Sequence, residues 1–162
     1  MALETKAGTA TEVRAASARD AEELLRLRVA VLAGEPVTAE WRATFLADMK
    51  SQLGRNLDLV GYVAETGDTL AACAVGTVYR GIGGPGYPQG LWARIHLVVA
   101  DPRFRRRGLA SECMNALVAD LRARGCTSIE LRSSDEGVHL YRSLGFVEHG
   151  TYMALPHLTG TR

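Results

Sequence analysis

The stretch Val98–Ser111 constrains the fold of this chain more than any other. It combines an apolar strand end, a turn at Asp101-Pro102, a run of arginines and a helix that begins at Gly108. The first turn of a helix leaves backbone N–H groups without intrahelical partners, and the helix dipole adds partial positive charge there. Glycine lets a ligand approach the backbone closely. The stretch contains neither G-x-x-x-x-G-K-[ST] nor G-x-G-x-x-G, so the pattern alone leaves two interpretations: a phosphate or diphosphate cradle, or a solvated arginine run before an ordinary helix.

Two motifs make the chain resemble a known family. Arg105–Ala110 (Arg-Arg-Arg-Gly-Leu-Ala) is similar to the [QR]-x-x-G-x-[GA] signature of the GNAT acetyltransferases. Leu140–Phe146 (Leu-Tyr-Arg-Ser-Leu-Gly-Phe) resembles the L-Y-x-x-L-G-F segment of the same family, at the spacing that the family requires. The resemblance covers the span from about Trp92 to Phe146, and the earlier residues agree only in the order of their elements.

Hydrophobic periodicity and turn residues predict alternating strands and helices after a flexible tail at residues 1–10. The expected strands lie at 11–16, 57–65, 70–79, 91–99, 127–132, 146–148 and 151–155. The expected helices begin at the capping box Ser17–Asp20, at Thr38, at Gly108 and at a cap on Asp135, and they end near Gly34, Gly54, Gly125 and Gly145. The turn Thr66-Gly67-Asp68 joins a hairpin, and the glycine-rich segment Arg80–Gly90 is either a flexible connection or a substrate lid.

This order of elements is that of the GNAT fold, so the resemblance implies one α/β (α+β) domain over residues 11–162. Its mixed central sheet would hold about seven strands flanked by about four helices. The strands on either side of the helix at Gly108 should be parallel, with a right-handed crossover. In the family, the strand ending at Val99 and the one at Ile129–Leu131 splay apart, and the pantetheine of the cofactor lies in the gap. Ligands commonly bind outside the carboxyl ends of parallel strands.

Composition excludes several classes of protein. The chain has 162 residues, 47% of them hydrophobic, and a net charge of +1, which fits one globular domain without a global field for nucleic acid. Its three cysteines lack C-x-x-C spacing, so neither a disulfide nor a zinc site is expected, and a cytoplasmic location fits. Residues 1–10 lack the apolar core of a signal peptide, and no apolar run reaches the roughly 20 residues that span a bilayer. We therefore expect no metal, no nucleic acid and no membrane partner.

The resemblance implies that acetyl-CoA is the cosubstrate. Its diphosphate would lie on backbone amides at the helix start, namely those of Arg106, Arg107, Gly108, Leu109, Ala110 and Ser111. Arg103 and Arg105 would contact the diphosphate or the adenosine 3′-phosphate. The pantetheine arm would pair like an added strand with the backbone of Leu97, Val98 and Val99. Ser134 stands where the family often has an asparagine that contacts the cofactor, and Gly137 stands where alanine is usual. One extra residue before Pro102 predicts a local bulge there.

Tyr141 is the best single catalytic candidate. In the family, a tyrosine at this position is the usual general acid, and a phenol with a pKa of about 10 stays protonated at neutral pH and can donate to a leaving thiolate. The alternative is that Tyr141 packs in the core. A backbone N–H near Val99 would hold the oxyanion.

The general base is less determined. His96 lies on the strand that leads to the cofactor site, and an unperturbed histidine has a pKa of about 6.5. The family more often uses a glutamate or a water chain, and Arg94 occupies about the place of that glutamate. Glu65 and Glu130 are further candidates by strand position. A buried, hydrogen-bonded His96 without a catalytic role is the competing interpretation.

The sequence thus predicts an N-acetyltransferase in which a primary amine attacks acetyl-CoA directly in a ternary complex. The alternative is a non-catalytic module that binds or senses acyl-CoA. The acceptor is a small amine, an amino acid or a peptide N-terminus, and the expected pocket walls are Trp41, Phe45, Tyr87, Trp92 and Tyr152. The family suggests a homodimer, through the last strands or the early helices.

Overall fold

The computed structural model describes residues 10–32, 34–55, 58–150 and 153. The chain divides into two compact units, Met1–Arg132 and Ser133–Arg162, and each is described by itself. The first unit holds a sheet, three of the helices and the stretch Val98–Ser111. The second unit holds one short helix.

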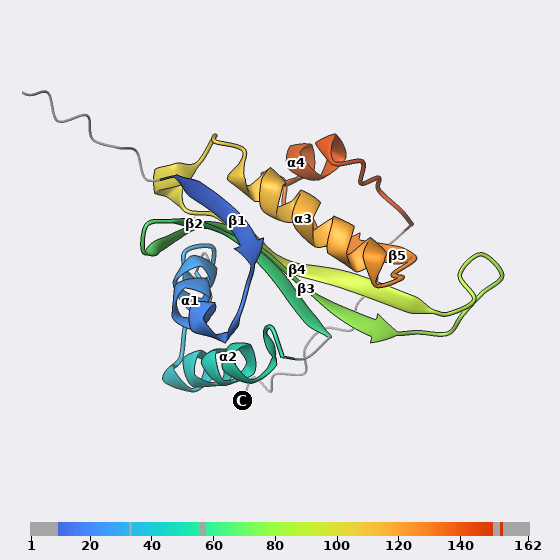
Figure 1. The fold of residues 1–162 in the computed structure, drawn as a ribbon, viewed down its shortest axis with the longest axis horizontal. Coiled ribbons are helices and arrows are strands. Elements are labelled where there is room, and N and C mark those ends of the chain that lie inside the picture. Colours follow the sequence, from blue (N-terminus) through green and yellow to red (C-terminus); the bar gives the residue numbers. More distant parts are fainter. Residues whose placement is uncertain (1–9, 33, 56–57, 151–152, 154–162) are drawn as a thin grey trace, which may run out of the picture. The chain divides into compact units, whose positions relative to one another are not determined.

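The first unit is built on a five-stranded sheet with the order β1-β2-β3-β4-β5 (Figure 1). The strands are β1 (Thr11–Ala15), β2 (Leu59–Thr66), β3 (Thr69–Arg80), β4 (Leu91–Ala100) and β5 (Ser128–Leu131). Each of the first four strands pairs antiparallel with the next one along the chain, while β4 and β5 pair in parallel. Helix α3 (Leu109–Ala123) makes the crossover between these two, which confirms the mixed sheet predicted from the order of elements.

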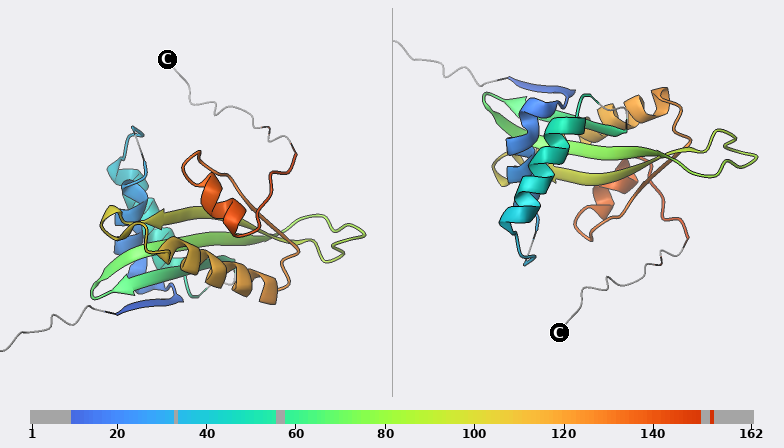
Figure 2. Two further views of the ribbon diagram at one scale, coloured as in Figure 1. Left: turned by 90° about the horizontal axis from the view of Figure 1, so that it is seen from above. Right: turned by 90° about the horizontal axis from the view of Figure 1, so that it is seen from below.

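Helices cover both faces of this sheet. Figure 2 shows α1 (Ala21–Val29) and α2 (Ala39–Gln52) on one face and α3 on the other. The predicted capping box is present, because the Ser17 N–H donates to the Asp20 carboxylate over 2.8 Å. The Thr38 hydroxyl accepts from the Trp41 N–H over 3.1 Å, so α2 also begins where the sequence indicated.

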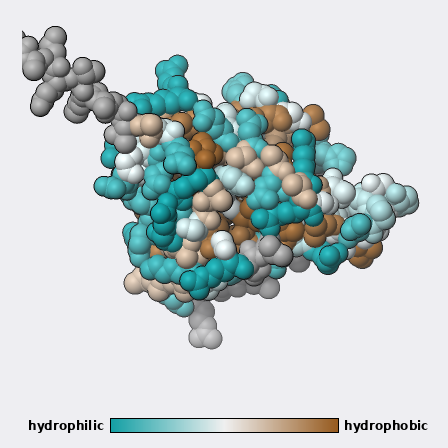
Figure 3. Space-filling view, viewed as in Figure 1, coloured by the Kyte–Doolittle hydropathy of each residue, from teal (hydrophilic) through white to brown (hydrophobic). Residues whose placement is uncertain are grey.

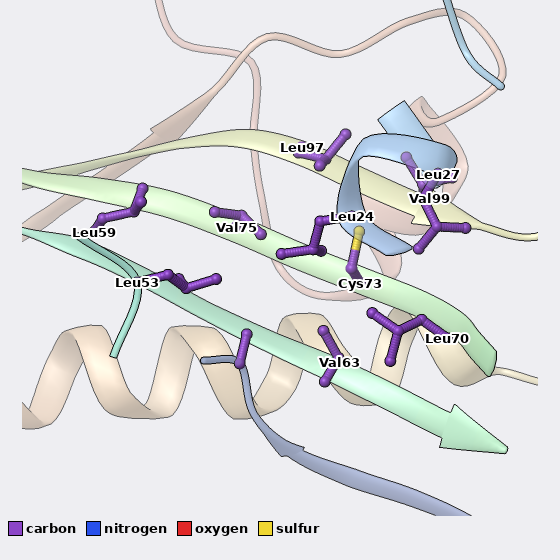
Figure 4. Close-up of a cluster of buried hydrophobic side chains, with 11 residues drawn as sticks. Leu24, Leu27, Leu53, Leu59, Val63, Leu70, Cys73, Val75, Leu97 and Val99 are labelled. Carbon is purple, nitrogen blue, oxygen red and sulfur yellow. The ribbon is translucent and has the colours of Figure 1, made fainter. Parts of the chain in front are cut away.

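The main core lies between the sheet and the first two helices. In Figure 4, Leu24 and Leu27 of α1 lie over Cys73 of β3 and Val99 of β4. Helix α2 buries no residue completely and contributes only its partly buried Phe45 and Met49. On the opposite face, α3 buries an apolar row at helical spacing: Leu109, Cys113, Met114, Leu117 and Leu121. In the space-filling view of Figure 3, hydrophilic and hydrophobic residues are interspersed over the side shown.

Strand β4 changes face at a bulge. Ile95 lies opposite Gly76 and Leu97 lies opposite Val75, so His96 is an extra residue in β4. Opposed residues share a face, so Leu97 joins the α1 core, whereas Ile95 faces the side of α3. The sequence predicted a bulge just before Pro102. The register shift at His96 shows that the irregularity of β4 lies earlier, in the middle of the strand.

Five strands, not seven, are present among the described residues. The expected strand at 146–148 is wrong, because the Phe146 N–H donates to the Tyr141 carbonyl over 3.0 Å and so belongs to the C-terminal cap of α4 (Val138–Ser143). Most of the expected strand at 151–155 lies outside the described residues. The cap on Asp135 is also wrong, because α4 begins after Gly137, whose N–H donates to the Ser134 hydroxyl over 3.3 Å.

Candidate active site

The two parallel strands stay paired only at their beginnings. Their register runs from Trp92 opposite Ser128 to Ile95 opposite Leu131. Strand β4 then continues to Ala100 without a β5 partner in the part of the chain that the structure describes. The predicted pantetheine-binding residues Leu97, Val98 and Val99 lie on this free length. Such an edge offers backbone N–H and C=O groups to an extended, amide-rich ligand.

Asp101 anchors the turn that follows β4. Its backbone N–H donates to the Ala71 carbonyl over 2.8 Å, and its side chain is almost fully buried. The carboxylate accepts from the Arg103 N–H over 2.9 Å, from the Arg103 guanidinium over 2.8 Å and from the Arg26 guanidinium over 2.6 Å. The hydrogen bonds from Arg103, with that from Arg26, hold the pKa of Asp101 well below its ordinary range. The turn is therefore charged and fixed at neutral pH.

Helix α1 supplies the other half of this anchor. Arg26 also donates to both carboxylate oxygens of Glu23 over 2.8 Å and to the Leu70 carbonyl over 2.9 Å. Glu23 in turn accepts from the Leu70 N–H over 3.0 Å. The network joins α1, the start of β3 and the turn after β4. The sequence predicted a turn at Asp101-Pro102 but no anchoring role for Asp101 or Arg26. The local signal was an aspartate between an apolar strand end and a proline.

The stretch from Asp101 to Ser111, here named the anion turn, has an irregular backbone. A short 3₁₀ turn (Pro102–Phe104) is followed by two left-handed residues, Arg106 with a φ of 63° and Gly108 with a φ of 75°. The guanidinium carbons of Arg103 and Arg107 each lie 5.4 Å from the centre of the Phe104 ring. This stacking orders the two arginines around one aromatic side chain.

The anion turn ends at free helix N–H groups. No side chain caps α3 at Gly108, and the first N–H bonded within the helix is that of Glu112, which donates to the Gly108 carbonyl over 3.0 Å. The N–H groups of Leu109, Ala110 and Ser111 precede it, so they have no intrahelical acceptor. A Cβ built on Gly108 would meet no atom within 4 Å, so the space beside the helix start is open. These features fit a diphosphate.

The predicted cations are arranged in two ways. Arg105 and Arg106 are exposed and form no ion pair among the residues described. Arg103 is also exposed, but its guanidinium is held by Asp101, so its expected contact with a phosphate remains a prediction.

His96 belongs to a second cluster of polar residues, on β3, β4 and β5. This cluster, here named the polar end, consists of Thr77, Tyr79, Arg94, His96 and Glu130. His96 Nε2 lies 2.7 Å from the Thr77 hydroxyl oxygen. Glu130 accepts from the Tyr79 hydroxyl over 3.0 Å and pairs with Arg94 over 3.5 Å. His96 is exposed, so the expectation that it is buried is wrong, while the expectation that it is hydrogen-bonded is confirmed. Its catalytic role stays a prediction.

The charges around His96 favour its neutral form. Partial burial lowers the pKa of His96 below its ordinary value of 6.5, and the nearby Arg94 and Arg28 lower it further, while Glu130 opposes them. Of the other candidate bases, Glu65 is paired with Arg14 over 2.7 Å and Glu130 is engaged as described above. Among the described residues, His96 is therefore the candidate base that is not held in an ion pair.

Aromatic residues gather where the β3–β4 hairpin leaves the sheet. The ring centre of Trp92 lies 6.1 Å from that of Tyr79 and 5.8 Å from that of Tyr87. Two of the expected acceptor-wall residues, Tyr87 and Trp92, are thus neighbours. Trp41 and Phe45 pack together on α2, with ring centres 5.6 Å apart, and Tyr152 lies outside the described residues. Figure 1 shows the 81–90 loop extending beyond the sheet.

Tyr141 belongs to the second unit. Its half-buried ring makes an edge contact with Phe146, with centres 6.1 Å apart, and burial raises the pKa of its phenol. A Cβ on Gly137 would lie 2.9 Å from the Tyr141 ring, so glycine allows the ring to lie against the backbone. Within residues 133–150 the Tyr141 hydroxyl has no hydrogen-bond partner. It is therefore a protonated donor that these residues leave unused.

Several other features bear on the chemistry. Burial raises the pKa of Cys73 and of Cys113 to about 12, and it also raises that of Cys126, so none of the three thiols is an activated nucleophile.

Among the described residues, no cluster of metal-ligating side chains occurs and no helix has the length and apolar character to cross a membrane. Cavities of about 180 and 140 Å³ lie in the first unit. Glu65 lines the larger one, and the predicted cofactor-binding residues line neither.

Comparisons with known proteins point to one family. The family model of the acetyltransferase (GNAT) family matches residues 24–146. An uncharacterized protein of Mycobacterium leprae is 32% identical over 88 residues, which are 54% of this chain, and the chain spans only 23% of that relative's length. A predicted acetyltransferase with acetyl-CoA from Clostridium acetobutylicum superposes with a TM-score of 0.80 at 22% identity, over 91% of this chain and 96% of its own. A GCN5-related N-acetyltransferase from Ralstonia eutropha gives 0.76 at 25% identity, over 91% and 99%.

Proposed function

Because the chain belongs to the acetyltransferase (GNAT) family, we propose that it transfers the acetyl group of acetyl-CoA to a primary amine. The observation that carries the proposal is the anion turn. Its helix start offers three unpaired N–H groups beside an open glycine, and exposed arginines surround it. A diphosphate is the part of acetyl-CoA that such a start recognises. The acceptor is a small amine, an amino acid or a peptide N-terminus.

The cofactor residues follow the sequence prediction. The backbone of Arg106 to Ser111 holds the diphosphate, and the exposed Arg105 contributes charge to it or to the 3′-phosphate. The free length of β4, at Leu97, Val98 and Val99, pairs with the pantetheine amides. Ser134 keeps a hydroxyl proton to donate to the cofactor, because its oxygen is the acceptor in its bond with Gly137. Asp101 and Arg26 contribute indirectly, since they hold the turn in place.

The reaction is a direct aminolysis of the thioester. The amine nitrogen attacks the carbonyl carbon, the C–S bond breaks, and Tyr141 gives its phenolic proton to the departing sulfur. His96 takes the proton that the amine loses. A backbone N–H near Val99 stabilises the oxyanion. The buried, high-pKa cysteines support attack by the amine itself rather than an acyl-enzyme route.

The first test is calorimetric titration of acetyl-CoA into the protein and two glycine variants. Gly108→Glu places a carboxylate at the start of α3 and should abolish binding. Gly125→Glu is the matched control, because Gly125 also has a left-handed φ of 90° and no neighbour within 4 Å, but it follows the other end of the helix. The control should bind within about threefold of the unaltered protein. Equal binding by both variants, or none by the unaltered protein, contradicts the proposal.

The second test separates an enzyme from a binding module. Release of free thiol from acetyl-CoA is followed with a panel of primary amines. Tyr141→Phe should lower kcat by about 100-fold while the Kd for acetyl-CoA stays nearly unchanged, because only proton donation is lost. Tyr62→Phe is the comparison variant, because its hydroxyl donates to Asp120 and not to a predicted site residue, and it should leave kcat within about twofold. Tight binding without thiol release for any amine would favour the acyl-CoA-sensing alternative.

A further inference from the structure

Thr77 and His96 form a pair that the bulge in β4 creates. His96 is the extra residue of that bulge, and its Nε2 lies 2.7 Å from the Thr77 hydroxyl oxygen. Gly76, which precedes Thr77, allows the strands to approach, because a Cβ there would lie 2.8 Å from the Arg94 carbonyl oxygen. Threonine is stiff about χ1, so the half-buried Thr77 offers its hydroxyl in a defined direction. The histidine ring is thereby held although it is exposed.

The direction of this hydrogen bond decides whether His96 keeps a ring nitrogen with a free lone pair. If the Nε2–H donates to the Thr77 oxygen, Nδ1 keeps its lone pair and can accept a proton. If the hydroxyl donates to Nε2 instead, Nδ1 carries the hydrogen and the neutral ring has no free lone pair. Partners of this kind set the tautomer of catalytic histidines.

We propose that Thr77 is a positioning residue that accepts the Nε2–H of His96 and leaves Nδ1 as the base for the acceptor amine. The inference rests on the proposed acetyltransferase function and deepens it. The amine nitrogen forms its bond to the acetyl carbon, and its surplus proton passes to Nδ1. The C–S bond then breaks, and the leaving sulfur takes the phenolic proton of Tyr141. His96 becomes an imidazolium that still donates through Nε2–H to Thr77, so the hydrogen bond is kept throughout the step.

The surroundings of the ring support this role. Arg94 on β4 and Arg28 on α1 disfavour the imidazolium, and Glu130 on β5 offsets them in part. Glu130 is itself engaged by Tyr79 and Arg94. The lowered pKa keeps the ring mainly neutral at pH 7 before the reaction. It also favours release of the accepted proton to water afterwards.

The first experiment needs no acceptor. Long-range ¹H–¹⁵N spectra of the free protein report the tautomer of each histidine, and His96→Gln assigns the His96 signals. We expect the Nε2–H tautomer in the unaltered protein and in Thr77→Ser. Thr77→Val should give a mixture of tautomers, while Thr127→Val, which removes a hydroxyl elsewhere in the sheet region, should change nothing. An Nδ1–H tautomer in the unaltered protein, or the same tautomer in Thr77→Val, overturns the proposal.

The second experiment uses an amine that the protein acetylates. Thr77→Val should lower kcat about tenfold and leave the KM for acetyl-CoA within twofold, and Thr77→Ser should restore the rate. In the His96→Gln background, Thr77→Val should have no further effect, which a general loss of structure would not reproduce. If His96→Gln is as fast as the unaltered protein, this inference is wrong and the proposed function stands. If the unaltered protein acetylates no amine, the proposed function fails and the base role with it.

Discussion

The anion turn follows β4, the polar end spans β3, β4 and β5, and the two regions are held in different ways. At the anion turn, Asp101 is 2% exposed and its carboxylate joins two arginines and a backbone N–H. At the polar end, His96 is exposed, and within the described part of the chain its side chain has one hydrogen-bond partner, Thr77. A backbone that presents N–H groups to a diphosphate must be rigid, whereas side chains that meet an acceptor need only local support. The difference explains why the sequence indicates the cofactor but not the amine.

The largest expected loss of stability comes from replacing Asp101, the buried carboxylate that anchors the anion turn. Asp101→Asn leaves two guanidinium groups facing a neutral amide in a buried turn, so we expect the free energy of unfolding to fall by about 3 kcal/mol. Glu130→Gln removes a carboxylate from the polar end, where the ion pair is more exposed, and should cost less than about 0.5 kcal/mol. Urea unfolding of both variants measures the contrast. Equal losses would show that the two regions are held alike.

Next in size is the close contact at the bulge. In Gly76→Ala the new Cβ would lie 2.8 Å from the Arg94 carbonyl oxygen, so β3 and β4 must move apart. We expect a loss of about 2 kcal/mol from this overpacking, together with changed NMR signals of His96. Gly81→Ala is the control, because its Cβ would meet the Trp92 ring at an ordinary 3.4 Å. If the NMR signals of His96 are unchanged in Gly76→Ala, the bulge at His96 does not depend on the glycine at position 76.

The contribution of Asp101 should depend on pH. Its pKa is depressed in the folded protein, so its stabilisation is fully present above the unfolded value of 3.8 and is lost as pH falls toward the folded value. The stability difference between the unaltered protein and Asp101→Asn should therefore be constant above about pH 5 and narrow below about pH 4, by at most about 1.4 kcal/mol per pH unit. Unfolding curves at several pH values measure it, and a difference that widens in acid would contradict the assignment.

The smallest effect concerns the backbone of the anion turn. Arg106 has a left-handed φ of 63°, which glycine adopts without strain, so Arg106→Gly should change stability by less than about 0.5 kcal/mol in either direction. Arg105 has an ordinary φ of −58°, so Arg105→Gly should lose about 0.5–1 kcal/mol. Thermal unfolding of the pair tests this. A larger loss in Arg106→Gly than in Arg105→Gly would mean that the arginine side chain, not the backbone, stabilises the turn.

Elements with strong local signals were predicted well. The sequence predicted β4 at 91–99, and the strand spans Leu91–Ala100. It placed the start of α3 at Gly108 and that of α2 at Thr38, because glycine and threonine act on their immediate neighbours. One error is the bulge expected just before Pro102, which lies at His96 instead. The others lie at α4, where an aspartate suggested a cap and an apolar run suggested a strand. Instead, the Ser134 hydroxyl accepts from the Gly137 N–H before α4, and the Phe146 N–H donates to the Tyr141 carbonyl after it.

The sequence by itself determined the family, the order of the elements and the place of the anion turn, because motifs and turn residues carry their geometry locally. Only the tertiary structure decided which side chains meet around them. Arg26 and Asp101 are 75 residues apart, and no spacing rule joins them. The buried residues Ala93, Ile95, Leu97 and Val99 alternate as if on one face, yet the bulge at His96 divides them between two. That division depends on pairing with β3, so it arises only when the sheet forms and turns His96 toward Thr77.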